Sequence, residues 1–186
     1  DRLLKLSTEE ACRYLGAAGV ELMMVNIKRS VERLGVRFDN FFSETSLHTS
    51  GLAEHMLGEL RERNVIVEHD GAIWFSEDGS PIRAGQGVKR DDYADDEAPA
   101  EDEEGGTTAV QAVMFRSPRV SPDPIDRPTY FFSDVPYLWN KLVERAFKLA
   151  VYVWGEDHQA DVPRLQAAAR VLALDGNAVK ILIYRF

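Results

Sequence analysis

The last third of the chain alternates between β-prone and helical segments, and this alternation restricts the fold more than any other feature of the sequence. Strands and helices are predicted in turn over residues 129–133, 135–148, 149–154, 160–174 and 178–184. A strand, helix, strand, helix, strand order is typical of a parallel sheet with right-handed crossovers. We therefore expect an α/β fold in which this βαβαβ segment is the second half of a doubly wound parallel sheet.

One predicted strand ends in residues suited to binding a ligand. The apolar run over residues 151–154 stops at Gly155 and is followed by Asp157 and His158. These groups would lie at the carboxyl edge of the sheet, where open α/β sheets bind ligands. Gly155 would let a ligand approach the backbone, and Asp157 would accept hydrogen bonds from hydroxyls such as those of a ribose. The alternative, a strand-to-helix turn with Asp157 as a cap, stays open.

A second pair of candidate residues belongs to the predicted strand over residues 129–133. Tyr130 lies on this strand, and the turn that follows it can bring the carboxylate of Asp134 back towards the phenol. A carboxylate beside a phenol suits a cationic ligand, above all a guanidinium, which offers a fork of donors. Because Pro136 follows closely, a simple helix-capping role for Asp134 is the alternative.

The segment that precedes residue 70 has helical patterns. A capping-box sequence over residues 7–10 begins a first helix, which Gly16 and Gly19 are expected to break. Apolar residues recur at helical spacing over residues 20–34, and we expect this methionine-bearing stripe to lie in the core. A third helix is predicted over about residues 51–63.

A β-hairpin and an acidic insertion follow. Asp70-Gly71 separates two short β-prone runs, which is a strong hairpin signal, and a strand over residues 109–115 is expected to pair with residues 73–75. Between them, residues 76–108 are interpreted as a mobile loop, with an acidic docking tail as the alternative. The net charge of −9 is carried by the nine acidic residues of the stretch 91–104, so the rest of the chain is electrically balanced.

Composition restricts the class of protein. The single cysteine, Cys12, cannot form an internal disulfide, so a reducing cytoplasm is expected. No apolar run approaches the length of a membrane span, and the first residues lack the apolar core of a signal peptide. His48, His55 and His69 do not have metal-ligand spacing, and no metal site is predicted. The chain begins in the middle of a pattern, as expected for an internal segment.

Several stretches, in the same order, resemble the arginyl-tRNA synthetases, a family of class I aminoacyl-tRNA synthetases. They are Ile27-Lys28, Leu34-Gly35-Val36-Arg37-Phe38-Asp39, Phe42-Ser43-Glu44-Thr45-Ser46-Leu47, Asp70-Gly71-Ala72-Ile73-Trp74-Phe75, Pro128-Thr129-Tyr130-Phe131 with Asp134 and Tyr137, and Val153-Trp154-Gly155-Glu156-Asp157-His158 with Val162-Pro163-Arg164-Leu165. Together they cover nearly the whole chain outside residues 76–108. Their common order makes the resemblance specific.

The resemblance implies an enzyme that activates arginine with ATP and transfers the arginyl group to tRNA(Arg). It implies that Tyr130 and Asp134 contact the side chain of the substrate arginine. It also implies that Gly155, Asp157 and His158 bind ATP at its ribose. Mg²⁺ would accompany ATP in the parent enzyme, and no tightly bound cofactor is expected.

The chain also departs from the family pattern. The His-x-Gly-His and Lys-Met-Ser-Lys motifs, which supply positive charge and donors around the ATP phosphates in class I synthetases, are both absent. We therefore predict no catalytic residue in the chain and no activity of the chain alone. Tyr137 and Gln159 are secondary candidates for lining the pocket, although Gln159 stands where a second histidine is usual. Glu156 replaces a small residue.

The resemblance divides the chain into three expected parts. Residues 1–70 would be a helical insertion, residues 71–128 a β-hairpin region with the acidic loop 76–108, and residues 129–186 the C-terminal half of a Rossmann-like catalytic domain. A cytoplasmic monomer is expected. Two alternatives stay open, namely a diverged synthetase-like protein that binds nucleotide or amino acid without catalysis, and a metal-dependent hydrolase built on Asp157, His158 and Asp161.

Overall fold

The computed structural model describes residues 6–83, 109–116 and 127–185, and it separates into two compact units. The first unit comprises Asp1–Phe42 and the second comprises Ser43–Phe186. The acidic stretch 91–104 lies outside the described residues.

The first unit is built on one long helix, α1 (Thr8–Arg33). Its N-terminus has the predicted capping box, in which the Ser7 backbone N–H donates to the Glu10 carboxylate at 2.8 Å and the Glu10 N–H donates to Ser7 Oγ at 3.3 Å. The predicted break at Gly16 and Gly19 is wrong, because each glycine costs only about 1 kcal/mol within a helix and the helix continues through both. The apolar stripe is not a core face of this unit, since no residue of α1 is buried.

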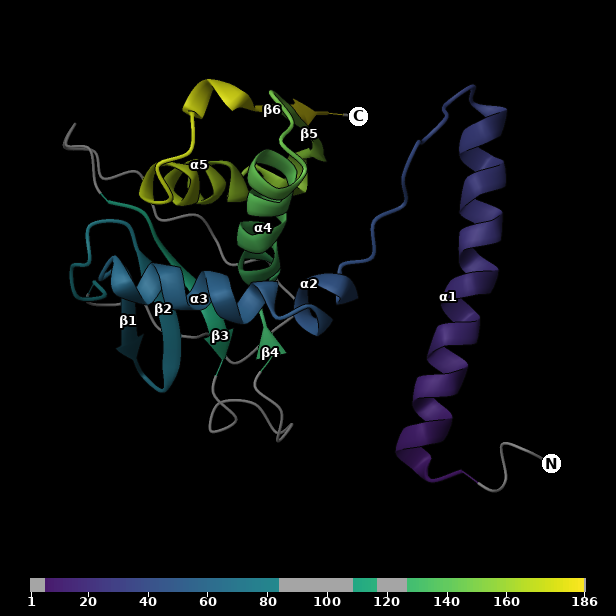
Figure 1. The fold of residues 1–186 in the computed structure, drawn as a ribbon, viewed down its shortest axis with the longest axis horizontal. Helices are drawn as coiled ribbons and strands as arrows, with labels where there is room; N and C mark the ends of the chain where they lie inside the picture. Colours follow the sequence, from purple (N-terminus) through teal and green to yellow (C-terminus); the bar gives the residue numbers. More distant parts are fainter. Residues whose placement is uncertain (1–5, 84–108, 117–126, 186) are drawn as a thin grey trace. The chain divides into compact units, whose positions relative to one another are not determined.

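The second unit contains the remaining elements, of which Figure 1 labels the α-helices and the strands. They are α2 (Thr45–Thr49), α3 (Leu52–Glu62), β1 (Ile66–His69), β2 (Ala72–Ser76), β3 (Gln111–Arg116), β4 (Arg127–Pro128), α4 (Tyr130–Trp139), the π-helical turn η2 (Asn140–Glu144), β5 (Ala150–Gly155), the 3-10 turn η3 (Glu156–His158), α5 (Asp161–Val171), the 3-10 turn η4 (Gly176–Ala178) and β6 (Val179–Tyr184).

Strands β1 to β4 form an antiparallel sheet in chain order. The predicted hairpin is confirmed, since Asp70 and Gly71 have φ angles of 48° and 72° and so provide the two positive φ values of a type I′ turn. Strand β3 pairs with β2 as predicted, with Phe75 opposite Ala112. The strands on either side of the insertion, β2 and β3, are therefore paired neighbours in one sheet.

Strands β5 and β6 pair in parallel, with Ala150 opposite Val179 and Gly155 opposite Tyr184. Helix α5 connects them, so the last strand, helix and strand of the predicted order are confirmed. The described strands thus make an α/β fold with a two-stranded parallel sheet beside a four-stranded antiparallel sheet.

The first strand predicted for this segment, residues 129–133, is wrong because these residues begin α4. Thr129 is the N-cap, and its Oγ1 accepts a hydrogen bond from the Phe132 N–H at 3.4 Å. A short apolar and aromatic run has no periodicity that separates a strand from a buried helix, and here the threonine cap starts a helix.

Helix α4 links the two halves of the core. Its residues Phe131 and Val135 pack in a cluster with Met56 of α3, Phe75 of β2 and Met114 of β3. Further along α4, Leu138 belongs to a second cluster that covers one face of β5 and β6, with members Ala150, Tyr152, Leu165 and Ala169. Helix α4 contacts both α3 and α5, whose positions Figure 1 shows.

Candidate functional site

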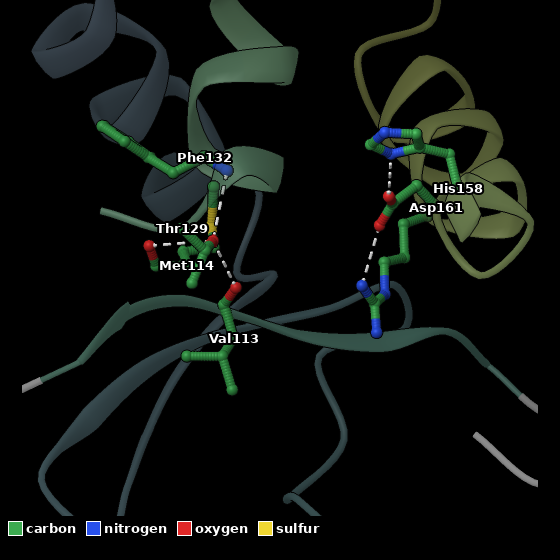
Figure 2. Close-up of polar contacts among 7 residues, drawn as sticks. Val113, Met114, Thr129, Phe132, His158 and Asp161 are labelled. Carbon is green, nitrogen blue, oxygen red and sulfur yellow. Dashed lines mark hydrogen bonds and ion pairs between the residues drawn. The ribbon is translucent and has the colours of Figure 1, made fainter. Parts of the chain in front are cut away.

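The start of α4 is fixed by hydrogen bonds to the antiparallel sheet. Thr129 Oγ1 donates to the Val113 carbonyl at 2.8 Å, and the Thr129 N–H donates to the Met114 carbonyl at 2.9 Å, as Figure 2 shows for the side chain. These bonds set the position of the first turn of α4, which carries Tyr130.

Tyr130 and Asp134 stand four residues apart on α4, so they share one face of the helix. The juxtaposition expected from a strand and turn is therefore produced by helical spacing instead. Tyr130 is 77% exposed, whereas Asp134 is partly buried. The tyrosine thus lies at the outer end of this face and the carboxylate at its inner end.

Asp134 is an unusual carboxylate. Its side chain has no hydrogen bond or ion pair with any residue that the structure describes. Burial, and then the negative charge of Asp161, raise the pKa of Asp134 to about 7, and the positive charge of Lys141 opposes this rise. The charge of Glu44 has a smaller raising effect on this pKa, and the charge of His158 has a smaller lowering effect. The carboxylate has therefore lost hydration, and the positive charge of Lys141 compensates its negative charge only in part.

Lys141, on the turn η2, is the positive charge that most strongly opposes the rise in the pKa of Asp134. Its Nζ lies 3.6 Å from the ring centroid of Tyr137 and 3.9 Å from that of Tyr152, which is cation–π geometry on both sides. Burial lowers the pKa of Lys141 to about 8, and the charge of Asp134 counteracts this shift. We call Asp134, Tyr137, Lys141 and Tyr152 the Asp134 cluster.

Tyr152 closes the Asp134 cluster from β5. Its hydroxyl is buried and has no hydrogen-bond partner among the described residues. Burial, followed by the charges of Asp134 and Tyr137, raises the pKa of Tyr152. Sequence reasoning predicted Tyr137 as a lining residue but missed Lys141 and Tyr152. The signal for Lys141 was its spacing, because it is seven residues after Asp134 and four after Tyr137 on one helical face.

At the end of β5 the chain turns through η3. Gly155 has ordinary extended dihedral angles, so it is not required for its φ. A Cβ at Gly155 would collide with Asp157 Oδ1, so the space that was expected to admit a ligand holds the neighbouring carboxylate. Asp157 is otherwise exposed to solvent, where it can accept hydrogen bonds. Gln159 is also exposed, and Glu156 forms an ion pair with Arg185 at 3.1 Å.

His158 is held from the side of α5. As Figure 2 shows, Asp161 lies between two partners: its Oδ2 is 3.1 Å from His158 Nδ1, and its Oδ1 accepts from Arg164 at 2.8 Å. Arg164 is buried at 5% exposure. The His158 ring also lies 5.7 Å from that of Trp154, centroid to centroid. Both oxygens of Asp161, which the hydrolase alternative used as a metal ligand, are engaged by side chains of the protein.

The Asp134 cluster lies within range of charged groups at the end of β5. Asp134 is influenced by the charges of both His158 and Asp161, so the structure brings the two predicted groups of site residues within electrostatic reach of each other.

Among the described residues, no group of three or more histidine, cysteine, aspartate or glutamate side chains is arranged to hold a metal ion. A hollow at the β1–β2 turn, lined by His69, Asp70 and Phe115, contains none of the predicted site residues. The described part of the chain has no helix of the length and apolarity that crossing a membrane requires.

Comparison with known proteins relates the chain to the arginine–tRNA ligases. No family model matches the chain. It is 31% identical over 183 residues to an arginine–tRNA ligase of Geobacter sp. strain M21 and 34% identical over 177 residues to that of Syntrophotalea carbinolica. These alignments cover 98% and 95% of this chain but only 27% and 26% of the relatives.

A solved structure shares the fold. The chain superposes with a TM-score of 0.67 on a crystal structure from Campylobacter jejuni that is named as an arginyl-tRNA synthetase, at 24% identity, and the match covers 97% of this chain and 32% of that one. The resemblance predicted from sequence is therefore confirmed. The chain is a homologue of the arginine–tRNA ligases over nearly all of its own length and about a quarter of theirs.

Proposed function

We propose that this chain supplies the arginine- and ATP-binding part of an arginine–tRNA ligase. The whole protein would activate arginine with ATP and transfer the arginyl group to tRNA(Arg). The single observation that carries this proposal is Asp134, a partly buried carboxylate without a hydrogen bond or ion pair among the described residues and with its pKa raised to about 7. Strongly perturbed groups of this kind concentrate at functional sites.

A guanidinium fits the chemistry of Asp134. The carboxylate loses hydration on burial, and a ligand that brings a positive charge and two parallel N–H donors would replace that hydration directly. Tyr130, on the same face of α4, would contact the ligand at the exposed end, and Tyr137 would line the site beside Lys141. We assign the arginine side chain to this place.

ATP would bind at the end of β5. Asp157 is exposed beside Gly155, with His158 next to it, at the carboxyl end of a parallel strand. Asp157 would accept hydrogen bonds from the ribose hydroxyls, and Gln159 is a secondary contact. Mg²⁺ would arrive with the ATP phosphates. The sequence contains neither class I signature motif, so we assign no catalytic residue to this chain.

The fold proposal is the C-terminal half of a Rossmann-like domain over residues 129–186, preceded by a helical region to residue 70 and a β-hairpin region to residue 128. The outer face of β5 and β6 supports it, because Val151, Val153 and Leu182 are exposed there. Parallel sheets are normally covered on both faces, so this face suits further layers of a larger α/β domain. A cytoplasmic, monomeric enzyme is part of the same proposal.

Two reciprocal substitutions test the two sites. Asp134→Asn should weaken binding of L-arginine to the chain at least tenfold, because a charge-assisted pair is worth about 1.5–3 kcal/mol, and should leave ATP binding unchanged. Asp157→Asn should weaken the binding of ATP and leave the binding of arginine unchanged. Calorimetric titration at pH 8 measures both, with citrulline as the neutral counterpart of arginine. Arginine affinity that survives Asp134→Asn would contradict the assignment of the guanidinium contact.

The alternative is a diverged synthetase-like protein that binds without catalysis, and the departures from the family pattern at Glu156 and Gln159 favour it. An aminoacylation assay distinguishes the two functions. A polypeptide with the full length of the relatives should charge tRNA(Arg) if the first proposal holds. Arginine and ATP binding without charging would support the alternative.

A further inference from the structure

His158, Asp161 and Arg164 form a chain of contacts from the surface to the interior. Side-chain exposure falls from 43% at His158 to 17% at Asp161 and 7% at Arg164. Asp161 bridges the other two, with His158 Nδ1 at 3.1 Å and an Arg164 N–H donor at 2.8 Å. The buried guanidinium therefore fixes the orientation of the carboxylate that faces the imidazole.

The chemistry of this contact determines where the imidazole carries its proton. An ionised carboxylate only accepts hydrogen bonds, so a neutral His158 must place its proton on Nδ1 to bond with Asp161. Nε2 then has a lone pair and cannot donate. This matters because His158 Nε2 lies only 3.9 Å from Asp157 Oδ2, so a proton on Nε2 would be attracted to the carboxylate assigned to the ribose.

We propose that Asp161, braced by Arg164, is a positioning residue that holds the proton of His158 on Nδ1 and so keeps the Asp157 carboxylate available to the hydroxyls of a nucleotide ribose. The part of this inference that concerns the nucleotide rests on the proposed function. The part that concerns the tautomer rests only on the three side chains. Asp161 would not touch the nucleotide.

Asp161→Asn gives a directional test. Arg164 only donates, so it would hold the oxygen of the new amide and turn the amide N–H towards His158 Nδ1. His158 must then accept at Nδ1 and carry its proton on Nε2. Long-range ¹H–¹⁵N spectra of the imidazole, recorded at about pH 8.5 where an ordinary histidine is neutral, should show the tautomer change from Nδ1–H to Nε2–H.

Nucleotide binding supplies the second readout. In the Asp161→Asn variant the new Nε2–H would compete for Asp157, and ATP affinity should fall about tenfold, since a hydrogen bond to a charged group is worth about 1.5–3 kcal/mol. The affinity for 2′,3′-dideoxy-ATP, which has no ribose hydroxyl, should not change. Glu156→Gln is the matched control, because it removes a neighbouring negative charge that pairs with Arg185 and should alter neither tautomer nor affinity.

The outcomes separate the two parts. A His158 proton that stays on Nδ1 in both Asp161→Asn and Asp161→Ala overturns the inference, whatever the nucleotide does. A changed tautomer with an equal loss for ATP and dideoxy-ATP overturns the link to the ribose. If the tautomer changes but the parent chain binds no ATP, the positioning role of Asp161 holds and the proposed nucleotide site fails.

Discussion

Asp134, the proposed contact for the arginine side chain, lowers the stability of the folded protein at neutral pH. Its pKa is about 7 in the folded chain and near 3.8 when solvated, so between these values the folded state binds more protons than the unfolded state. The free energy of unfolding must then fall as the pH rises from about 4 to about 7. Above pH 7 the whole penalty is present.

Asp134→Asn should remove this penalty. We expect the variant to be more stable than the parent by about 1–3 kcal/mol at pH 7.5, less than the full pKa shift implies because Lys141 loses its counter-charge. At pH 4 the two proteins should be equally stable, since Asp134 is protonated in the folded parent. Urea unfolding at the two pH values measures the difference.

The exposed Glu68→Gln is the control for this experiment, because it removes one carboxylate that is not buried. It should give the same stability as the parent at both pH values. If Asp134→Asn lowers stability at pH 7.5, then the charge of Asp134 is already compensated in the folded state, and Asp134 is not the binding site for a cationic ligand. The stability gain and the loss of arginine binding belong to one variant, as expected for a functional site.

Among the elements, those with clear periodicity or turn chemistry were predictable. The Asp70-Gly71 hairpin, α3, α5 and the parallel pair of strands follow from local pattern, because each has its own start or stop signal. Helix α4 was not predictable in this way. Its aromatic start looks like a strand, and the contact of Thr129 with β3 that fixes it is long-range.

The candidate site was predictable only in part. Sequence reasoning chose Asp134 and Asp157, but the cluster around Asp134 depends on Lys141 lying between Tyr137 of α4 and Tyr152 of β5. A lysine in a helical pattern is ordinarily a surface residue, so its burial follows from how α4 packs on the sheet. The roles of Asp161 and Arg164 likewise depend on contacts across a turn that leads into a helix.

Gln111, at the start of β3, joins the strand to the turn that follows β2. Its amide donates to the Pro81 carbonyl at 3.1 Å and to Ser76 Oγ at 3.3 Å, and its oxygen accepts from the Arg83 N–H at 3.2 Å. Gln111→Met keeps the volume but leaves buried partners unsatisfied. The variant should lose about 2–3 kcal/mol in the free energy of unfolding, measured with urea.

The matched control is Gln166→Met on α5, where the glutamine is exposed. It should change stability by less than about 0.5 kcal/mol. Equal effects of the two substitutions would mean that water replaces the Gln111 hydrogen bonds, and the turn after β2 would then not depend on them.

At the scale of the whole molecule, stability should reside in the second unit. The buried hydrophobic residues begin at Leu47, and none lies on α1. We therefore expect residues 43–186 alone to unfold in urea with the same midpoint and slope as the whole chain. Trp74, Trp139 and Trp154 all lie in this unit, so tryptophan fluorescence reports the same transition in both proteins.

A cut at residue 64 is the control, because it removes α2 and α3 with the core residues Leu47, Met56 and Leu60. That shorter chain should show no cooperative transition, since the loss of several buried apolar side chains exceeds the stability of a typical domain. A lower midpoint for residues 43–186 would contradict our expectation. It would show that residues 1–42 contribute to the stability of the protein, as the core role predicted from the helical spacing of residues 20–34 requires.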